Sequence, residues 1–200
     1  VQNFFAEVTL TPNQQMFSSR VTIEPGPSDS TVFESLKTLA VTTAKSGYYG
    51  GVRLLRALCF KFYEYCAKRG YDLDERGFTL EYESNIPTQA GLSGSSAIIV
   101  AGLKCLMQHY RVYIPLEDQP ALVLSCEHDL GINAGLQDRV IQCYEGVVYM
   151  DFSNEEMVRT QGKGLYTRSL LGTSSRVGTP WRPRITDSQP VGRNLGSIPA

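Results

Sequence analysis

Several features that would mark a specialised class of protein are missing from this 200-residue sequence. Its five cysteines are odd in number and scattered, without a CxxC pair, so they predict neither a disulfide framework nor a zinc cluster. No run approaches the roughly 20 apolar residues that a membrane span needs, and no charged-then-apolar signal segment opens the chain. These absences predict a globular protein of a reducing compartment, the cytoplasm, with no membrane contact.

An excess of charge of one sign is also missing, because 19 basic residues balance 20 acidic ones for a net charge of −1. Residues 167–200 nevertheless carry five arginines and one aspartate, a net charge of +4, which leaves about −5 for residues 1–166. Half of residues 167–200 are Ser, Thr, Gly or Pro, and no strand or helix period follows Leu171, so we predict a disordered basic tail. Without a dense Lys/Arg run, this tail does not predict nucleic-acid binding.

Hydrophobic periodicity predicts a mixture of strands and helices before this tail. Two period-2 runs, residues 4–10 and 19–25, are separated by a turn-rich segment and predict a hairpin. Apolar spacing predicts a short helix over residues 30–39 and a longer amphipathic helix over residues 51–69. The alternating run at residues 77–84 predicts a half-buried strand.

A loop rich in glycine and serine, residues 91–96, follows that strand and opens a further helix near Ser95 or Ser96. Glycines let backbone N–H groups approach an anion, and a helix N-terminus adds roughly half a positive charge, so phosphate is the natural occupant. The Ser95 and Ser96 hydroxyls are able to contact phosphate oxygens or a magnesium ion. The loop matches neither the Walker A motif nor GxGxxG, and the alternative is a flexible turn that caps a core helix.

Two acids follow downstream, at opposite sides of a Gly-Ile-Asn-Ala-Gly break. Glu127 lies in the last turn of one predicted helix, and Asp138 lies eleven residues later in the first turn of the next. If both carboxylates point into one cleft beside the loop, they supply a metal ligand and a base, as phosphoryl transfer requires. The alternative is a pair of solvated acids on helix surfaces.

Together, these motifs resemble a known family. The segment from Pro87 to Ala97 is similar to the second motif of the GHMP kinases, PxxxGLGSSAA, a family that includes galactokinase, homoserine kinase and mevalonate kinase. This chain has GLSGSS where most members have GLGSS, so its loop is one residue longer. With INAGLQDRV, GYYGG and VYMDFS, this loop resembles the glucuronokinase branch of the family. The resemblance covers about residues 1–166.

The resemblance implies an α+β fold for residues 1–166. This fold is the N-terminal ATP-binding domain of a GHMP kinase, a two-layer sandwich with a left-handed βαβ crossover. Two family motifs have no counterpart here: an early strand and turn, and a late glycine-rich motif of a second domain. We therefore expect the domain to be incomplete at its N-terminus, the C-terminal domain to be absent, residues 167–200 to be a disordered tail, and the chain itself to be inactive.

The resemblance also implies which residues bind ATP and Mg²⁺. Ser96 and Glu127 would hold the magnesium ion, and Asp138 would be the base that receives the proton of the substrate hydroxyl. The substrate would be a small sugar acid, D-glucuronate, phosphorylated at its anomeric hydroxyl. Arg53 and Arg139 are candidate partners for its carboxylate. The residues that would wrap the ATP phosphates are Pro87, Gly91, Leu92, Ser93, Gly94, Ser95, Ser96 and Ala97.

Two other functions are compatible with the same residues. The chain is either a non-catalytic pseudoenzyme or interaction fragment that retains a weak nucleotide site, or a GHMP kinase for another sugar or small alcohol. Neither the oligomeric state nor the sugar specificity follows from the sequence.

Overall fold

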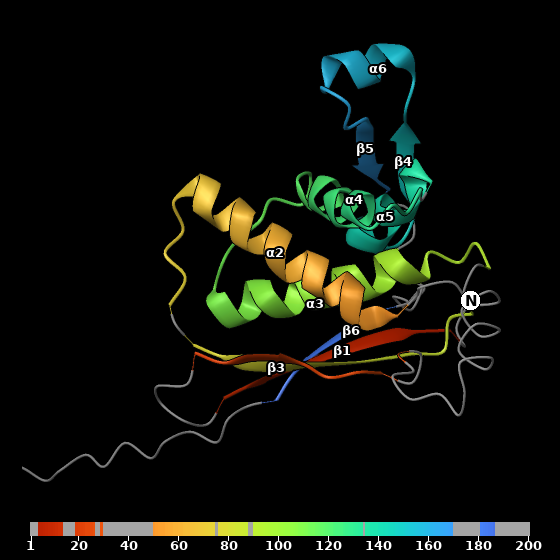
Figure 1. Cartoon of the computed structure of the whole chain (residues 1–200). Helices are drawn as coiled ribbons and strands as arrows, with labels where there is room; N and C mark the ends of the chain where they lie inside the picture. The colour runs from red at the N-terminus through yellow and green to blue at the C-terminus, as the bar shows by residue number, and fades with distance from the viewer. Residues whose placement is uncertain are drawn as a thin grey trace, which may run out of the picture.

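The computed structural model describes residues 4–13, 19–26, 29, 50–74, 76–87, 90–133, 135–169 and 181–186. Within these ranges the chain forms a mixed four-stranded sheet, a layer of helices over one face of that sheet, and a small two-stranded sheet (Figure 1). The predicted helix at residues 30–39 lies outside the described residues.

The four-stranded sheet has the order β2-β3-β1-β6. It contains β1 (Ala6–Pro12), β2 (Val21–Ile23), β3 (Phe78–Ser84) and β6 (Trp181–Ile185). Strand β3 is antiparallel to β1 and parallel to β2, and β6 is parallel to β1. Alternate residues of β1 and β3 face the helices and are buried, which is the period-2 pattern of the sequence. The buried side chains are Ala6, Val8, Leu10, Phe78, Leu80 and Tyr82.

The predicted hairpin is wrong, because β3 lies between β1 and β2. Both period-2 runs do contain strands, but each strand hydrogen-bonds to β3 instead of to the other. Strand β3 is hydrophobic on its inner face and pairs with β1 over seven residues. Strand β2 has only three residues, so it would be a shorter partner for β1 than β3 is. Because β2 and β3 are parallel neighbours joined through α2 (Gly51–Arg69), they form a βαβ unit. The left-handed sense of this crossover stays a prediction.

Helix α2 covers the residues for which the spacing predicts a helix, and it packs against β2, α3 and α4. Helix α3 (Gly94–Tyr110) is the central element, because it contacts β1, β3 and β6 on one side and α2, α4 and α5 on the other. Its sequence is apolar on almost all sides, as burial in such a position requires. At Gly102, a Cβ atom would lie 2.6 Å from Leu58 Cδ2, so the close approach of α2 and α3 depends on this glycine.

The outer helical layer consists of α4 (Gln119–Asp129) and α5 (Leu136–Tyr144). Beyond it, β4 (Val148–Asp151), α6 (Asn154–Arg159) and β5 (Leu165–Arg168) extend away from the main sheet (Figure 1). Strands β4 and β5 pair antiparallel. No helix in the described ranges combines the length and the apolar character that crossing a membrane requires.

The positions of β5 and β6 differ from the prediction that residues 167–200 form a disordered tail. Strand β6 lies wholly within residues 167–200, where the sequence predicts disorder, and β5 ends inside the same segment. The composition-based prediction therefore fails for residues 181–185, which pair with β1 from Ala6 to Leu10. Strand addition uses backbone hydrogen bonds, so a short segment can join a sheet edge without the hydrophobic alternation on which the prediction relied. Pro183 fits an outermost strand, because proline cannot donate to a second neighbour.

Candidate active site

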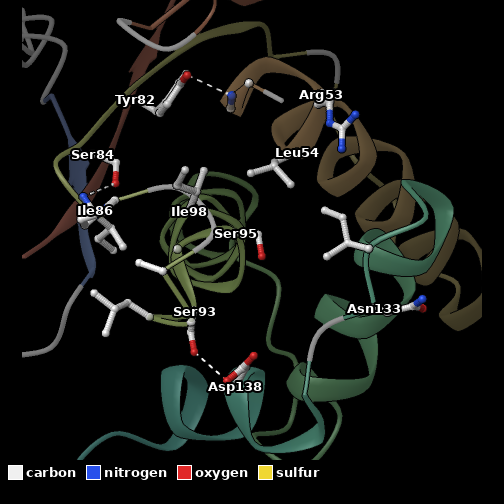
Figure 2. Close-up of a pocket in the computed structure, with 18 of the residues that line it drawn as sticks. Arg53, Leu54, Tyr82, Ser84, Ile86, Ser93, Ser95, Ile98, Asn133 and Asp138 are labelled. Carbon is white, nitrogen blue, oxygen red and sulfur yellow. Dashed lines mark hydrogen bonds between the residues drawn. The ribbon is translucent and has the colours of Figure 1, made fainter. Parts of the chain in front are cut away.

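A cavity of about 520 Å³ lies where the carboxyl end of β3 meets the N-termini of α2, α3 and α5. Its walls come from these four elements and from residues 131–133, which connect α4 to α5 (Figure 2). Among the described residues that line it, Arg53 on α2 is the one cation and Asp138 on α5 is the one carboxylate. The volume lies within the range of small-molecule sites, about 300–1,000 Å³.

The predicted phosphate loop forms one wall of this cavity. Gly91 and Ser93 both adopt left-handed backbone angles, with φ of 68° and 55°, and these two turns direct the chain from β3 into the first turn of α3. No side chain caps the N-terminus of α3. The N–H groups of that first turn have no partner within the helix, so they are able to bind an anion in the cavity. Thr88 and Gln89 lie outside the described residues.

Most of the residues predicted to bind ATP line the cavity, and two do not. The residues in its wall are Pro87, Gly91, Leu92, Ser93, Gly94 and Ser95. Ser96 and Ala97 lie in the first turn of α3 and are fully buried. Ala97 donates its N–H to the carbonyl of Ser93 at 3.0 Å, which is the first hydrogen bond of the helix. ATP binding by these residues stays a prediction.

Asp138 contacts the phosphate loop directly. The Ser93 hydroxyl donates to Asp138 Oδ1 at 2.8 Å, a contact between residues 45 positions apart in the sequence (Figure 2). Asp138 lies in the first turn of α5, the end of a helix where acidic side chains are common. The fold therefore brings the candidate base to the candidate phosphate site.

Glu127, near the end of α4, also contacts the phosphate loop. Its Oε1 atom accepts hydrogen bonds from both Ser95, at 3.0 Å, and Ser96, at 2.6 Å. Its Oε2 atom forms an ion pair with Arg139 Nη1 at 3.4 Å. The Glu127 side chain is fully buried and that of Arg139 is 3% exposed, so this ion pair lies in the interior beside the cavity. Because Arg139 is engaged there, it is not placed to bind a substrate carboxylate.

The oxygen atoms around Glu127 fit a magnesium ion. Magnesium prefers hard oxygen ligands and is usually held by one or two carboxylates together with waters and substrate phosphates. Glu127 supplies one carboxylate, and the hydroxyls of Ser95 and Ser96 each lie within 3.0 Å of its Oε1 atom. In the part of the chain that the structure describes, no group of three or more His, Cys, Asp or Glu side chains could hold a metal alone. A metal here would therefore need phosphate oxygens as well.

The N-terminus of α2 forms another wall of the cavity, and Tyr82 and Asp29, for which no functional role was predicted from the sequence, hold it in place. The Tyr82 hydroxyl accepts from Gly51 N at 2.9 Å and donates to Asp29 Oδ2 at 2.6 Å. Asp29 Oδ1 in turn accepts from Val52 N at 3.4 Å. A Cβ atom on Gly51 would lie 2.2 Å from the Tyr82 ring. The paired glycines of GYYGG were the available signal for this close approach. Tyr82 and Asp29 thus engage the N–H groups of Gly51 and Val52 at the start of α2.

Comparison with known proteins identifies the relatives of this chain. Residues 54–146, which include the loop, Glu127 and Asp138, match the family model described as GHMP kinases N terminal domain. The chain is 48% identical to probable glucuronokinase 2 and 47% identical to glucuronokinase 1, both of Arabidopsis thaliana. Each alignment covers 84% of this chain and 45% of the relative, so the chain spans about half the length of these curated relatives.

A weaker similarity reaches other sugar kinases. The galactokinase of Candida albicans is 33% identical over 70 residues, which cover 34% of this chain and 14% of that protein. No solved structure matches the chain significantly.

Proposed function

We propose that the chain, of which residues 54–146 match the family model of the GHMP kinase N-terminal domain, is the ATP-binding part of a sugar kinase that phosphorylates the anomeric hydroxyl of D-glucuronate. The sugar is proposed from the names of the two relatives, which are 48% and 47% identical to this chain over 84% of its length. The observation that carries the proposal is the contact between Ser93 and Asp138, at 2.8 Å, because it joins a candidate base to a candidate phosphate site.

The phosphate groups of ATP would bind at the start of α3. The open N–H groups of its first turn and the hydroxyl of Ser95 would donate to phosphate oxygens, and the helix dipole would favour their negative charge. Magnesium, when bound, would neutralise charge on the β- and γ-phosphates, with Ser96 and Glu127 as its protein ligands. Arg139 would keep Glu127 in place through the buried ion pair.

Asp138 would act on the sugar. Its carboxylate would accept the hydrogen bond of the anomeric hydroxyl and receive the proton as the hydroxyl oxygen attacks the γ-phosphorus. The bond from that phosphorus to the β–γ bridging oxygen breaks, and the products are ADP and the sugar 1-phosphate. Arg53 would bind the negative charge of the sugar acid or of the phosphates, since it is the one cation of the cavity wall within the described ranges.

Nucleotide binding is tested on the 200-residue chain by thermal unfolding. At a concentration one hundred times its dissociation constant, MgATP contributes about 2.7 kcal/mol, and we expect Tm to rise by roughly 5 °C or more. In Glu127→Ala and Ser96→Ala chains that remain folded, the additional rise that Mg²⁺ gives over ATP alone should be lost. An equal rise in the variants would contradict the metal assignment, and no rise with the unchanged chain would contradict the nucleotide site.

Phosphate transfer is tested with ATP labelled at the γ-phosphate. The protein to use is this chain lengthened at both ends to the span of its relatives, called below the lengthened chain. It should phosphorylate D-glucuronate at least tenfold faster than galactose or mevalonate. Asp138→Asn should lower kcat by about 10²–10⁴-fold. A preference for galactose or mevalonate would favour a GHMP kinase for another substrate. Binding of MgATP without any transfer would favour the non-catalytic alternative.

We also propose a cytoplasmic location. The proposal rests on the five cysteines, whose odd number and scattered positions without a CxxC pair are typical of a reducing compartment.

A further inference from the structure

Ser93 has no counterpart in the shorter GLGSS form of the loop, because it is the residue by which GLSGSS is longer. It occupies the N-cap position of α3, where a serine hydroxyl usually accepts a hydrogen bond from the first turn of the helix. The Ser93 side chain does not cap the helix and donates to Asp138 Oδ1 instead (Figure 2). The extra residue of the loop thus makes its side-chain contact with the candidate base.

We propose that Ser93 is a positioning residue for Asp138, an inference that rests on the proposed function. Its hydroxyl holds Oδ1, which leaves Oδ2 to accept the hydrogen bond of the substrate hydroxyl. Within the described part of the chain, Asp138 makes no other side-chain hydrogen bond. Among the described residues, Ser93 is therefore the one whose side chain orients this carboxylate through a hydrogen bond.

The backbone of Ser93 supports this role. Its φ of 55° and ψ of 34° lie in the left-handed region, which costs an L-residue other than glycine roughly 1–2 kcal/mol. Glycine would adopt the same angles without that cost. The hydroxyl contact to Asp138 is the structural feature that a glycine would lose.

The contact also links the two halves of the candidate site. Ser95 and Ser96, in the first turn of α3, hold Glu127 on α4, while Ser93, immediately before that turn, holds Asp138 on α5. The start of α3 therefore sets the positions of both acids with respect to the site proposed for the phosphates. A displacement of about 1 Å at such a site can lower the rate a hundredfold.

Two substitutions at Ser93 distinguish the effect of its hydroxyl from the effect of its backbone conformation. Ser93→Gly removes the hydroxyl and suits the left-handed conformation, whereas Ser93→Asn keeps a donor and tolerates that conformation. In the lengthened chain, with ATP and D-glucuronate, we expect Ser93→Gly to lower kcat about tenfold with less than a twofold change in the KM for ATP. Ser93→Asn should restore kcat to within about threefold. Ser125→Ala, a control on α4 whose hydroxyl donates to the Leu122 carbonyl, should leave both constants unchanged.

A double-mutant cycle tests whether Ser93 acts through Asp138. In an Asp138→Asn background, Ser93→Gly should change kcat by less than about twofold, because its partner no longer serves as the base. Provided that the lengthened chain without substitutions is active, three results would each overturn the inference. They are a tenfold loss of kcat in both backgrounds, an unchanged kcat in Ser93→Gly, and a rise in the KM for ATP as large as the loss in kcat. Absence of phosphate transfer by the unchanged lengthened chain would overturn the proposed function and this inference together.

Discussion

Arg139 and Glu127 form an ion pair in the interior, with both side chains at most 3% exposed. Two neighbouring serines complete the hydrogen bonding of Glu127. A buried pair of this kind contributes little compared with a well-packed apolar pair, but removal of one partner leaves an uncompensated charge. The pair is therefore better understood as a device that holds Glu127 at the start of α3 than as a source of stability.

We expect Arg139→Met to lower the free energy of unfolding by about 3–5 kcal/mol, because Glu127 would remain buried without its counter-charge. The double variant Arg139→Met/Glu127→Leu should recover most of this loss. Urea denaturation followed by circular dichroism measures both values. A loss below about 1 kcal/mol in the single variant would mean that the charge of Glu127 is satisfied in another way.

His109 gives the stability of the chain a dependence on pH. Its ring is buried, lies edge-on to Phe78 with centroids 5.3 Å apart, and contacts the carbonyl of Arg76. Burial is the main cause that lowers the pKa of His109 below 6.5, the nearby Arg76 charge lowers it further, and the Arg76 carbonyl and Asp74 oppose the shift. The folded state therefore binds this proton less readily than the unfolded state.

Because the unfolded state binds the extra proton first, the contribution of His109 is fully present above pH 6.5 and is lost as the pH falls towards the lower pKa of the folded state. We expect His109→Gln to flatten the dependence of the unfolding free energy on pH between about 7 and 5. His128→Gln is the control, since that ring is exposed and is the other histidine of the chain. Equal slopes for His109→Gln and the unchanged chain would contradict this account.

Strand β6 forms one edge of the main sheet. It pairs with β1 over five residues, and Thr186, just beyond it, donates its N–H to the Leu10 carbonyl at 3.2 Å. Arg184 forms an ion pair with Glu7 across the two strands, but its side chain is 64% exposed, so this contact adds little. Backbone hydrogen bonds therefore provide most of the pairing, and β6 covers an edge of β1 that would otherwise be open.

A chain that ends at residue 180 should be less stable than the complete chain by a few kcal/mol, since about five backbone hydrogen bonds are lost at roughly 0.5–1.5 kcal/mol each. The exposed edge of β1 should also promote association at high concentration. A chain that ends at residue 188 keeps β6 and is the matched control. Thermal unfolding and light scattering distinguish the two, and identical behaviour would mean that β6 does not stabilise the sheet.

Elements also differ in how well the sequence predicts them. Helix α2 occupies residues 51–69, where apolar spacing predicts a helix, because one buried stripe is enough to produce that pattern. Strand pairing was predicted less well, since the runs that contain β1 and β2 carry no signal for the partner that each of them chooses. That choice depends on β3, more than fifty residues further along the chain.

The fold shields the five thiols from solvent, four of them fully and Cys59 in part. Burial raises the pKa of Cys59, Cys105, Cys126 and Cys143 to about 12 and that of Cys66 to about 11. The thiolate is the reactive form, so these residues should be almost inert at neutral pH.

We expect a thiol reagent such as DTNB to label no cysteine rapidly in the folded chain at pH 8 and all five after denaturation in guanidinium chloride. Four of the thiols are buried, and Cys59 on α2 is partly buried, which makes Cys59 the residue to monitor. Labelling with a stoichiometry of one or more within seconds under native conditions would contradict the burial of these side chains. Mass spectrometry of the labelled peptides identifies the reacting residue.

The sequence by itself determined the local chemistry: a glycine-serine loop at a helix start, two acids eleven residues apart, and the periodicities of the main helices and strands. These depend on residues near one another in the chain, where backbone geometry leaves few alternatives. Only the tertiary structure decided that Ser93 meets Asp138, that Arg139 is buried against Glu127, and that β6 joins β1. Each of these contacts joins distant segments, and packing and backbone hydrogen bonds select them without a signature in the local sequence.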